Sequence, residues 1–270
     1  MKRPTLATAV AVVIAAGTLT GLGPAVAEAH SGGPHRQKPT VVLVHGAFAD
    51  SSGWNGVVSR LQKDGYPVVA VANPLRGVAS DAATVRSVLN DIDGPIVLAG
   101  HSYAGNVITE AAAGDRDVKA LVYVAAFLPD TGETAGGLSN KFPGSTLGST
   151  LHQVAVPGGG TDLYIDRALF PQQFAADLPL REAKLLAVGQ RPIDAGALAE
   201  PQAGAPAWKS IPSYDLIPEA DRNIPPAAQH WMAQRAKATT VSVKGASHLV
   251  LASHPGTTAA LIERAARENP

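Results

Sequence analysis

Cysteine is absent from this chain of 270 residues. Its absence excludes disulfide bonds, thiolate metal sites and catalysis by a thiol nucleophile. Charge is also scarce, because only 16% of the residues are charged, 22 basic side chains balance 22 acidic ones, and no basic cluster occurs. Nucleic acid is therefore not an expected partner, since phosphate binding needs a concentrated positive face.

Residues 1–27 have the pattern of a secretory signal peptide. Two basic residues precede an uncharged apolar run over residues 6–22, and the small-x-small sequence Ala25-Val26-Ala27 follows it. We expect cleavage after Ala27, with Ala29 as the alternative site. The run is short for a membrane span of about 20 apolar residues and is diluted by Gly and Thr. The expected mature protein is therefore secreted (extracellular) and has no membrane anchor.

The rest of the chain is expected to form a leader and one folded domain. Residues 28–38 contain glycine and proline and predict a flexible leader. Residues 39–270 form the expected domain, because 46% of the chain is hydrophobic, which is enough for one sizeable core.

Strand and helix patterns alternate along this domain and predict an α/β fold. The expected strands lie at residues 41–44, 68–71, 96–99, 120–125, 213–217 and 239–243. The expected helices lie at residues 54–61, 81–92, 107–112, 226–236 and 257–267, with Asp81 as a capping residue. Strands that are apolar on both faces need helices on each side of a sheet. The pattern therefore predicts about six mostly parallel strands with helices on both faces.

The regular pattern breaks between about residues 130 and 212. This stretch is dense in glycine and proline and has only short apolar pieces, so we expect an irregular insert. Long inserts in otherwise regular α/β chains are usually functional.

A nucleophile-elbow pattern follows the third expected strand. The sequence Gly100-His101-Ser102-Tyr103-Ala104-Gly105 lies between an apolar strand and a helix with one apolar face. Ala104 takes the place of the second glycine of the motif. A serine on so sharp a turn has a strained backbone and needs small neighbours. Ser102 is therefore the expected nucleophile.

His248 is the histidine best placed to activate this serine. It follows the last expected strand, at the sheet end where α/β proteins gather their active sites. The other histidines of the domain are His45 in a strand-end turn, His101 beside the serine, His152 in the insert, His230 within a helix and His254 before one. We expect His45 to be structural, His101 to point away from Ser102, and His152 to be available for substrate contact.

An acidic residue should orient the histidine and stabilise its charged form. Asp221 follows the fifth expected strand and lies between the serine and the histidine in the chain, which is the order typical of this motif. Asp130, after the fourth expected strand, and Glu219 are the alternatives.

Backbone N–H groups should stabilise the oxyanion that forms during acyl transfer. One is expected from Tyr103, at the start of the elbow helix. The other is expected from Ala47 in the His45-Gly46-Ala47-Phe48 turn, where glycine lets the backbone approach closely.

These motifs together resemble the α/β-hydrolase superfamily. The sequences that carry the resemblance are His45-Gly46-Ala47, Trp54, Gly100-His101-Ser102, Ala125–Asp130, Asp221–Pro225 and Gly245–His248. Within it they look like the branch of small esterases that includes plant methyl esterases, hydroxynitrile lyases and bacterial pyrethroid-hydrolase-like esterases. The resemblance implies that Ser102, His248 and Asp221 form a catalytic triad, and that Ala47 and Tyr103 supply the oxyanion hole. It also implies a small cap made by the insert, and no metal or organic cofactor.

Ester hydrolysis is the reaction that this resemblance favours, with a small-molecule ester as substrate. The hydroxynitrile lyases of the branch carry Thr in place of Gly46 and Lys after the catalytic histidine, where this chain has Leu249. Ser102 likewise excludes the aspartate-nucleophile chemistry of epoxide hydrolases and dehalogenases on this fold. The alternatives are acyl transfer or another lyase step at the same residues, or a non-catalytic small-molecule binder.

Overall fold

The structure, a computed structural model, describes residues 38–270. The expected signal peptide, and the expected leader up to residue 37, lie outside the described residues. Within the described part of the chain, no helix has the length and apolar character needed to span a membrane.

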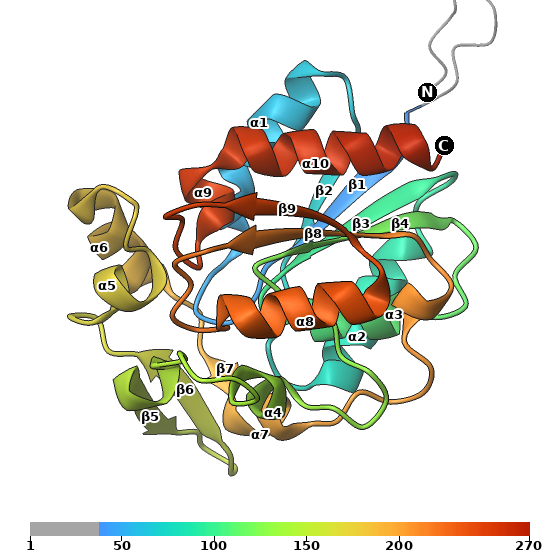
Figure 1. Ribbon diagram of the computed structural model, residues 1–270. Coiled ribbons are helices and arrows are strands. Elements are labelled where there is room, and N and C mark those ends of the chain that lie inside the picture. The colour runs from blue at the N-terminus through green and yellow to red at the C-terminus, as the bar shows by residue number, and fades with distance from the viewer. Residues whose placement is uncertain (1–37) are drawn as a thin grey trace, which may run out of the picture. The chain divides into compact units, whose positions relative to one another are not determined.

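A six-stranded parallel sheet forms the centre of the domain (Figure 1). Its strands, in spatial order, are β2 (Val68–Val71), β1 (Thr40–Val44), β3 (Ile96–His101), β4 (Val118–Val124), β8 (Ser213–Pro218) and β9 (Thr239–Val243). Every neighbouring pair is parallel. The expectation of about six mostly parallel strands is therefore confirmed, and all six strands of this central sheet are parallel.

Helices cover both faces of this sheet, as the apolar strands require. One face carries α1 (Asn55–Lys63), α9 (Val250–Ser253) and α10 (Pro255–Glu268), and the other carries α2 (Val78–Leu89), α3 (Ala104–Ala111) and α8 (Pro226–Ala236) (Figure 1). Residues 41–44 of β1 and every residue of β3 are buried. The central strands thus form the core between the two helical layers.

The second helix begins earlier than the sequence analysis expected, and Asp81 does not cap it. The helix α2 starts at Val78, so Asp81 lies inside its first turn. The N–H groups of Val78 and Ala79 instead donate to the carboxylate of Glu200, at 2.6 and 3.0 Å. A capping residue more than 120 positions away in the chain leaves no local signal, which explains the error.

The insert is more regular than expected. It contains a three-stranded antiparallel sheet, β5 (Leu151–Ala155), β6 (Thr161–Ile165) and β7 (Ile193–Asp194). It also contains the helices α4 (Ala135–Ser139), α5 (Phe170–Phe174), α6 (Leu180–Gly189) and α7 (Ala195–Ala199), with 3-10 turns η2 (Leu147–Thr150) and η3 (Ala207–Lys209). Most of these elements are five residues or shorter, which is too short to show a clear hydrophobic period. The three strands and the helices α5 and α6 lie beside the end of the sheet to which the strands point (Figure 1).

Candidate active site

Ser102 lies in a sharp turn between β3 and α3. Its φ angle is +56°, in the left-handed region that residues other than glycine rarely adopt. Its carbonyl oxygen accepts hydrogen bonds from the N–H groups of Gly105, at 2.9 Å, and Phe127, at 3.3 Å. These bonds hold the strained turn at the carboxyl end of β3, where the hydroxyl faces the insert.

Gly105 and Gly46 are among the glycines that this turn requires, because neighbouring backbone passes close to them. A Cβ atom at Gly105 would lie 2.0 Å from the carbonyl oxygen of Phe127. A Cβ atom at Gly46, in the turn after β1, would lie 2.7 Å from the Cβ of Ser102. The tight glycine of the elbow helix is therefore Gly105, while Ala104 fits without steric conflict at the preceding position, where it is fully buried.

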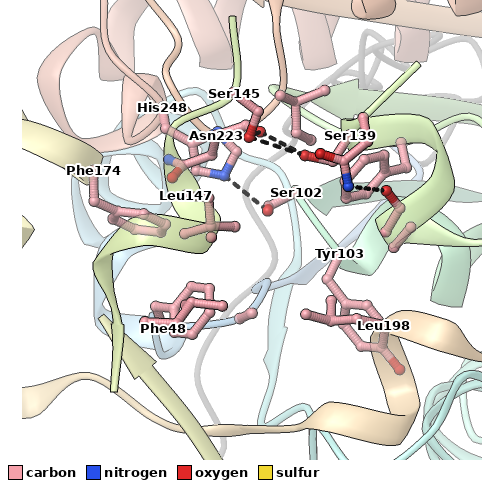
Figure 2. Close-up of a pocket in the computed structure, with 18 residues that line it drawn as sticks. Phe48, Ser102, Tyr103, Ser139, Ser145, Leu147, Phe174, Leu198, Asn223 and His248 are labelled. Carbon is pink, nitrogen blue, oxygen red and sulfur yellow. Dashed lines mark hydrogen bonds between the residues drawn. The ribbon is translucent and has the colours of Figure 1, made fainter. Parts of the chain in front are cut away.

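The structure brings Ser102, His248 and Asp221 together from three distant segments of the chain. The Ser102 hydroxyl lies 2.8 Å from Nε2 of His248 (Figure 2). Nδ1 of His248 lies 2.7 Å from Oδ2 of Asp221. All three residues are buried. Because an ionised carboxylate can only accept, Nδ1 carries the proton and Nε2 is free to accept the serine hydroxyl proton.

The Asp221 carboxylate is held by three further hydrogen bonds. Its Oδ1 accepts from the N–H groups of Asn223, at 2.7 Å, and Ile224, at 3.1 Å, and its Oδ2 accepts from the side-chain amide of Gln229, at 2.8 Å. These donors stabilise a buried negative charge and fix its direction toward His248. The sequence analysis did not identify Gln229, whose one sequence signal is its place in the first turns of α8.

The two alternative acids lie in other ion pairs. Asp130 pairs with Lys209 at 2.6 Å, and Glu219 pairs with Nε2 of His230 at 2.9 Å. Both carboxylates are about one-third exposed, whereas that of Asp221 is fully buried. Of the three candidates, only Asp221 is hydrogen bonded to His248 among the described residues.

His45 has a structural place in the turn after β1. Its Nδ1 donates to the Gly46 carbonyl oxygen at 3.0 Å, and its Nε2 accepts from the N–H of Asn73 at 3.0 Å. Burial lowers the pKa of this imidazole, so the ring is neutral and can serve as donor and acceptor at once. The turn that carries Ala47 is fixed in this way.

His101 points away from Ser102 and contacts both the backbone and the ring of His248. Its Nε2 donates to the backbone carbonyl oxygen of His248 at 3.1 Å, and the two rings lie 4.9 Å apart between centroids. Burial lowers the pKa of His101 well below its usual range, with a further contribution from His248. His152, by contrast, lies on β5 and does not line the pocket around Ser102.

Two residues that line the pocket beside Ser102 have backbone N–H groups without a partner within residues 38–270. Those of Ala47 and Tyr103 make no hydrogen bond to other described residues, while the N–H of Phe48 donates to the Arg191 carbonyl oxygen at 3.0 Å. Ala47 and Tyr103 both line the pocket that contains Ser102. These two N–H groups therefore remain candidates for the donors that an oxyanion requires.

The side chain of Tyr103 is anchored on the far side of the turn from Ser102 (Figure 2). Its hydroxyl donates to Oδ2 of Asp81 at 3.0 Å. Asp81 is fully buried and also accepts from the N–H of Arg76, at 3.1 Å. Burial raises the pKa of Asp81 and that of Tyr103.

A cavity of about 150 Å³, here called the inner pocket, opens in front of Ser102. Its walls are mostly apolar, and Figure 2 shows Phe48, Leu147, Phe174 and Leu198 around the serine. No lysine, arginine, aspartate or glutamate lines it. The polar groups that remain, besides Ser102 and His248, are hydroxyls and amides of the insert and of residue 223.

The apolar walls of the inner pocket come from short elements that carry no sequence motif. Phe174 packs edge-on against the ring of His248, with centroids 4.9 Å apart, and it comes from the five-residue helix α5. Leu147 comes from a 3-10 turn and Leu198 from the short helix α7. None of these short elements carries a motif, so only the three-dimensional arrangement identifies them.

Comparison with known proteins agrees with this fold. The model of the alpha/beta hydrolase family matches residues 41–261, so the chain belongs to the alpha/beta hydrolase family. The alpha/beta hydrolase nvfD of Aspergillus novofumigatus is 26% identical over 252 residues, which cover 86% of this chain and 98% of that protein.

Two solved structures show the same architecture. A methylesterase protein from Arabidopsis, MES16, has a TM-score of 0.72 at 18% identity and covers 85% of this chain and 99% of its own. A pyrethroid hydrolase from Sphingobium faniae JZ-2 has a TM-score of 0.70 at 22% identity, over 85% and 97% of the two chains. The expected membership of the α/β-hydrolase family is therefore confirmed, and these two structures share its fold.

Proposed function

We propose that this chain is a secreted serine carboxylesterase that cleaves small uncharged esters through Ser102, His248 and Asp221. The observation that carries the proposal is the buried hydrogen-bond path from the Ser102 hydroxyl through both nitrogens of His248 to Asp221. A serine hydroxyl is a weak nucleophile until a neighbouring base accepts its proton. This path supplies the base and a carboxylate that orients it.

The reaction proceeds by acyl transfer to serine and then to water. Ser102 Oγ attacks the ester carbonyl carbon while Nε2 of His248 takes the hydroxyl proton. The imidazolium returns this proton to the departing alcohol, which leaves an acyl-enzyme. Water, activated by the same Nε2, then attacks the acyl group and releases the carboxylic acid and free Ser102. Asp221 stays ionised and stabilises the charged imidazole throughout.

The N–H groups of Ala47 and Tyr103 form the oxyanion hole in this mechanism. They donate to the carbonyl oxygen as negative charge develops on it, and one such donor contributes about 10²–10³-fold in kcat. The general base adds about 10²–10⁴-fold.

The inner pocket and the relatives support an uncharged ester as the substrate. A carboxylate or ammonium group on the substrate would lose its hydration among these apolar walls and find no charged side chain of opposite sign. The structural relatives named above are a methylesterase and a pyrethroid hydrolase.

Active-site labelling with a fluorophosphonate tests the assignment of the nucleophile. We expect the purified protein to react at Ser102, and the Ser102→Ala variant to remain unlabelled and to hydrolyse no ester in a panel of aryl and alkyl esters. Equal labelling of both proteins, or ester hydrolysis by the variant, would refute the proposal. Labelling without hydrolysis, together with transfer of the acyl group to an added alcohol, would identify an acyltransferase instead.

Secretion is tested separately, because it depends on the sequence of residues 1–27 alone. We expect N-terminal sequencing of protein from the culture medium to begin at Glu28 or His30. Retention of the full-length chain with the cells would contradict this part of the proposal.

A further inference from the structure

A second cavity, here called the outer groove, lies against the inner pocket and has a volume of about 240 Å³. The insert forms one side of it through Phe170, Leu185, Leu186 and Gly189, and residues 48–53 after β1 form part of the other. The lining of the groove is mostly apolar, with Asp50, Ser52 and Gln190 as its polar residues, and it includes Leu185, which is 67% exposed on α6. Nothing in the proposed ester cleavage uses this groove.

Two phenylalanine rings separate the groove from the inner pocket. Phe48 and Phe174 line both cavities, and their rings meet edge to face with centroids 6.1 Å apart. Phe174 is fixed by further ring contacts with His248, at 4.9 Å, and Phe170, at 5.0 Å. Phe48 is buried and has Phe174 as its one aromatic neighbour among the described residues.

The inner pocket is too small to hold both arms of a bulky ester. An apolar cavity of about 150 Å³ accommodates a molecule of the size of benzene. The two cavities together reach the range of about 300–1,000 Å³ that is typical of small-molecule sites. The second arm of a larger ester would therefore need space beyond the inner pocket.

We propose that the outer groove is a second substrate subsite, which receives an extended apolar arm of the ester past the ring of Phe48. The preferred substrates are then uncharged esters with one compact arm, bound in the inner pocket, and one long apolar arm in the outer groove. This inference rests on the proposed esterase function and specifies its substrate class.

Gly189 offers a direct way to fill the outer groove. It is the last residue of α6, and a Cβ atom built there meets no other atom within 4 Å. The variant Gly189→Trp therefore adds an indole at a residue that lines the groove, without steric conflict at the backbone. Its matched control is Val188→Trp, because Val188 is 71% exposed on the same helix and lines neither cavity.

The test compares kcat/KM for 4-nitrophenyl acetate and 4-nitrophenyl octanoate. The nitrophenyl ring suits the inner pocket, and the octanoyl chain is long enough to extend past Phe48. We expect Gly189→Trp to lower the ratio of octanoate to acetate activity at least tenfold, and Val188→Trp to leave it within twofold. Thermal unfolding verifies that each variant is folded. If Gly189→Trp fails to fold, Leu185→Glu replaces it, with Val188→Glu as the control. We expect Leu185→Glu to lower the ratio of octanoate to acetate activity about threefold or more, because a charged side chain there disfavours an apolar arm in the groove.

The outcomes separate the two proposals. A wild-type enzyme that hydrolyses the acetate but not the octanoate would overturn the subsite while the esterase function stands. The subsite would also be overturned if the ratio of octanoate to acetate activity were unchanged in the groove variants, or fell equally in the control variants. Failure of the wild type to hydrolyse either ester and to react with a fluorophosphonate would instead overturn the esterase proposal itself.

Discussion

The end of the parallel sheet and the insert contribute different groups to the same pocket. The sheet end supplies Ser102, His248 and Asp221, each buried and fixed by backbone or side-chain hydrogen bonds. The insert supplies apolar walls from helices and turns of five residues or fewer, such as those carrying Leu147 and Phe174. The bond-making groups thus lie on rigid strand ends, and the groups that surround the substrate lie on short segments. We expect changes at the sheet end to act on kcat and changes in the insert to act on KM.

The largest effect is expected from the base at the sheet end. His248→Ala removes the acceptor of the Ser102 proton and should lower kcat by about 10⁴-fold or more. Steady-state kinetics with an activated ester measures this loss. The control His152→Ala changes a histidine of the insert that lies outside the inner pocket, and it should retain wild-type kcat. Activity of His248→Ala above about 1% of wild type would contradict the proposed role.

Filling the inner pocket from the insert should act mainly on KM. A Cβ atom at Gly148, in η2, meets no atom within 4 Å, so Gly148→Trp adds an indole at a residue that lines the pocket without backbone conflict. We expect KM for aryl esters to rise about tenfold, because ~1.4 kcal/mol of apolar contact is lost, while kcat changes less. Val154→Trp on β5, 40% exposed and outside the pocket, is the control. If Gly148→Trp lowered kcat at constant KM, the expected division between effects on kcat at the sheet end and effects on KM in the insert would be wrong.

A smaller effect is expected from the anchor of the proposed oxyanion donor Tyr103. Tyr103→Phe removes the hydrogen bond to buried Asp81 and should lower kcat about threefold to tenfold through a less well-placed N–H group, at nearly constant KM. Asp81→Asn keeps a hydrogen-bond acceptor and should lose less activity than Asp81→Ala. If the two Asp81 variants lose the same activity and stability, Asp81 is merely structural.

The smallest effect on catalysis, but a measurable effect on stability, is expected at Asp215 in the middle of β8. Burial raises the pKa of this carboxyl well above its usual range, and its oxygens have no hydrogen-bond partner among the described residues. The pKa of Asp215 is higher in the folded protein than in the unfolded chain. As the pH rises above the pKa of the unfolded chain, the unfolded state releases this proton while the folded state keeps it, so the free energy of unfolding falls. Asp215→Asn should therefore raise Tm more at pH 8 than at pH 5. Asp91→Asn, at an exposed position, is the control. Equal Tm differences at both pH values would contradict the prediction.

The sheet end could be predicted from the sequence because its signals are local. The β-branched runs of β1 to β4 and the small residues around Ser102 reflect burial and strain in their own segments. The order of Ser102, Asp221 and His248 in the chain then follows from the strand order of the fold. The carboxylate partner Gln229 was missed, since a glutamine in a helix has no distinctive pattern.

The insert could not be predicted to the same depth because its structure depends on distant contacts. The cap of α2 comes from Glu200, and Phe174 becomes a wall of the pocket only by packing on His248. Elements of five residues carry little periodicity, and their glycines and prolines read as irregular loop. The sequence therefore predicted where the insert lies but not its strands and helices.

The two regions are also physically joined, which bears on how such a protein can be re-engineered. The Phe48 N–H donates to the Arg191 carbonyl oxygen, and Glu200 binds the first N–H groups of α2. Replacing the insert with that of another hydrolase would remove both sets of hydrogen bonds. One of them is made by Phe48, the residue next to Ala47. Chimeras that keep Arg191 and Glu200 should therefore preserve turnover. Chimeras in which the whole insert is replaced should disturb the turn after β1 and the start of α2.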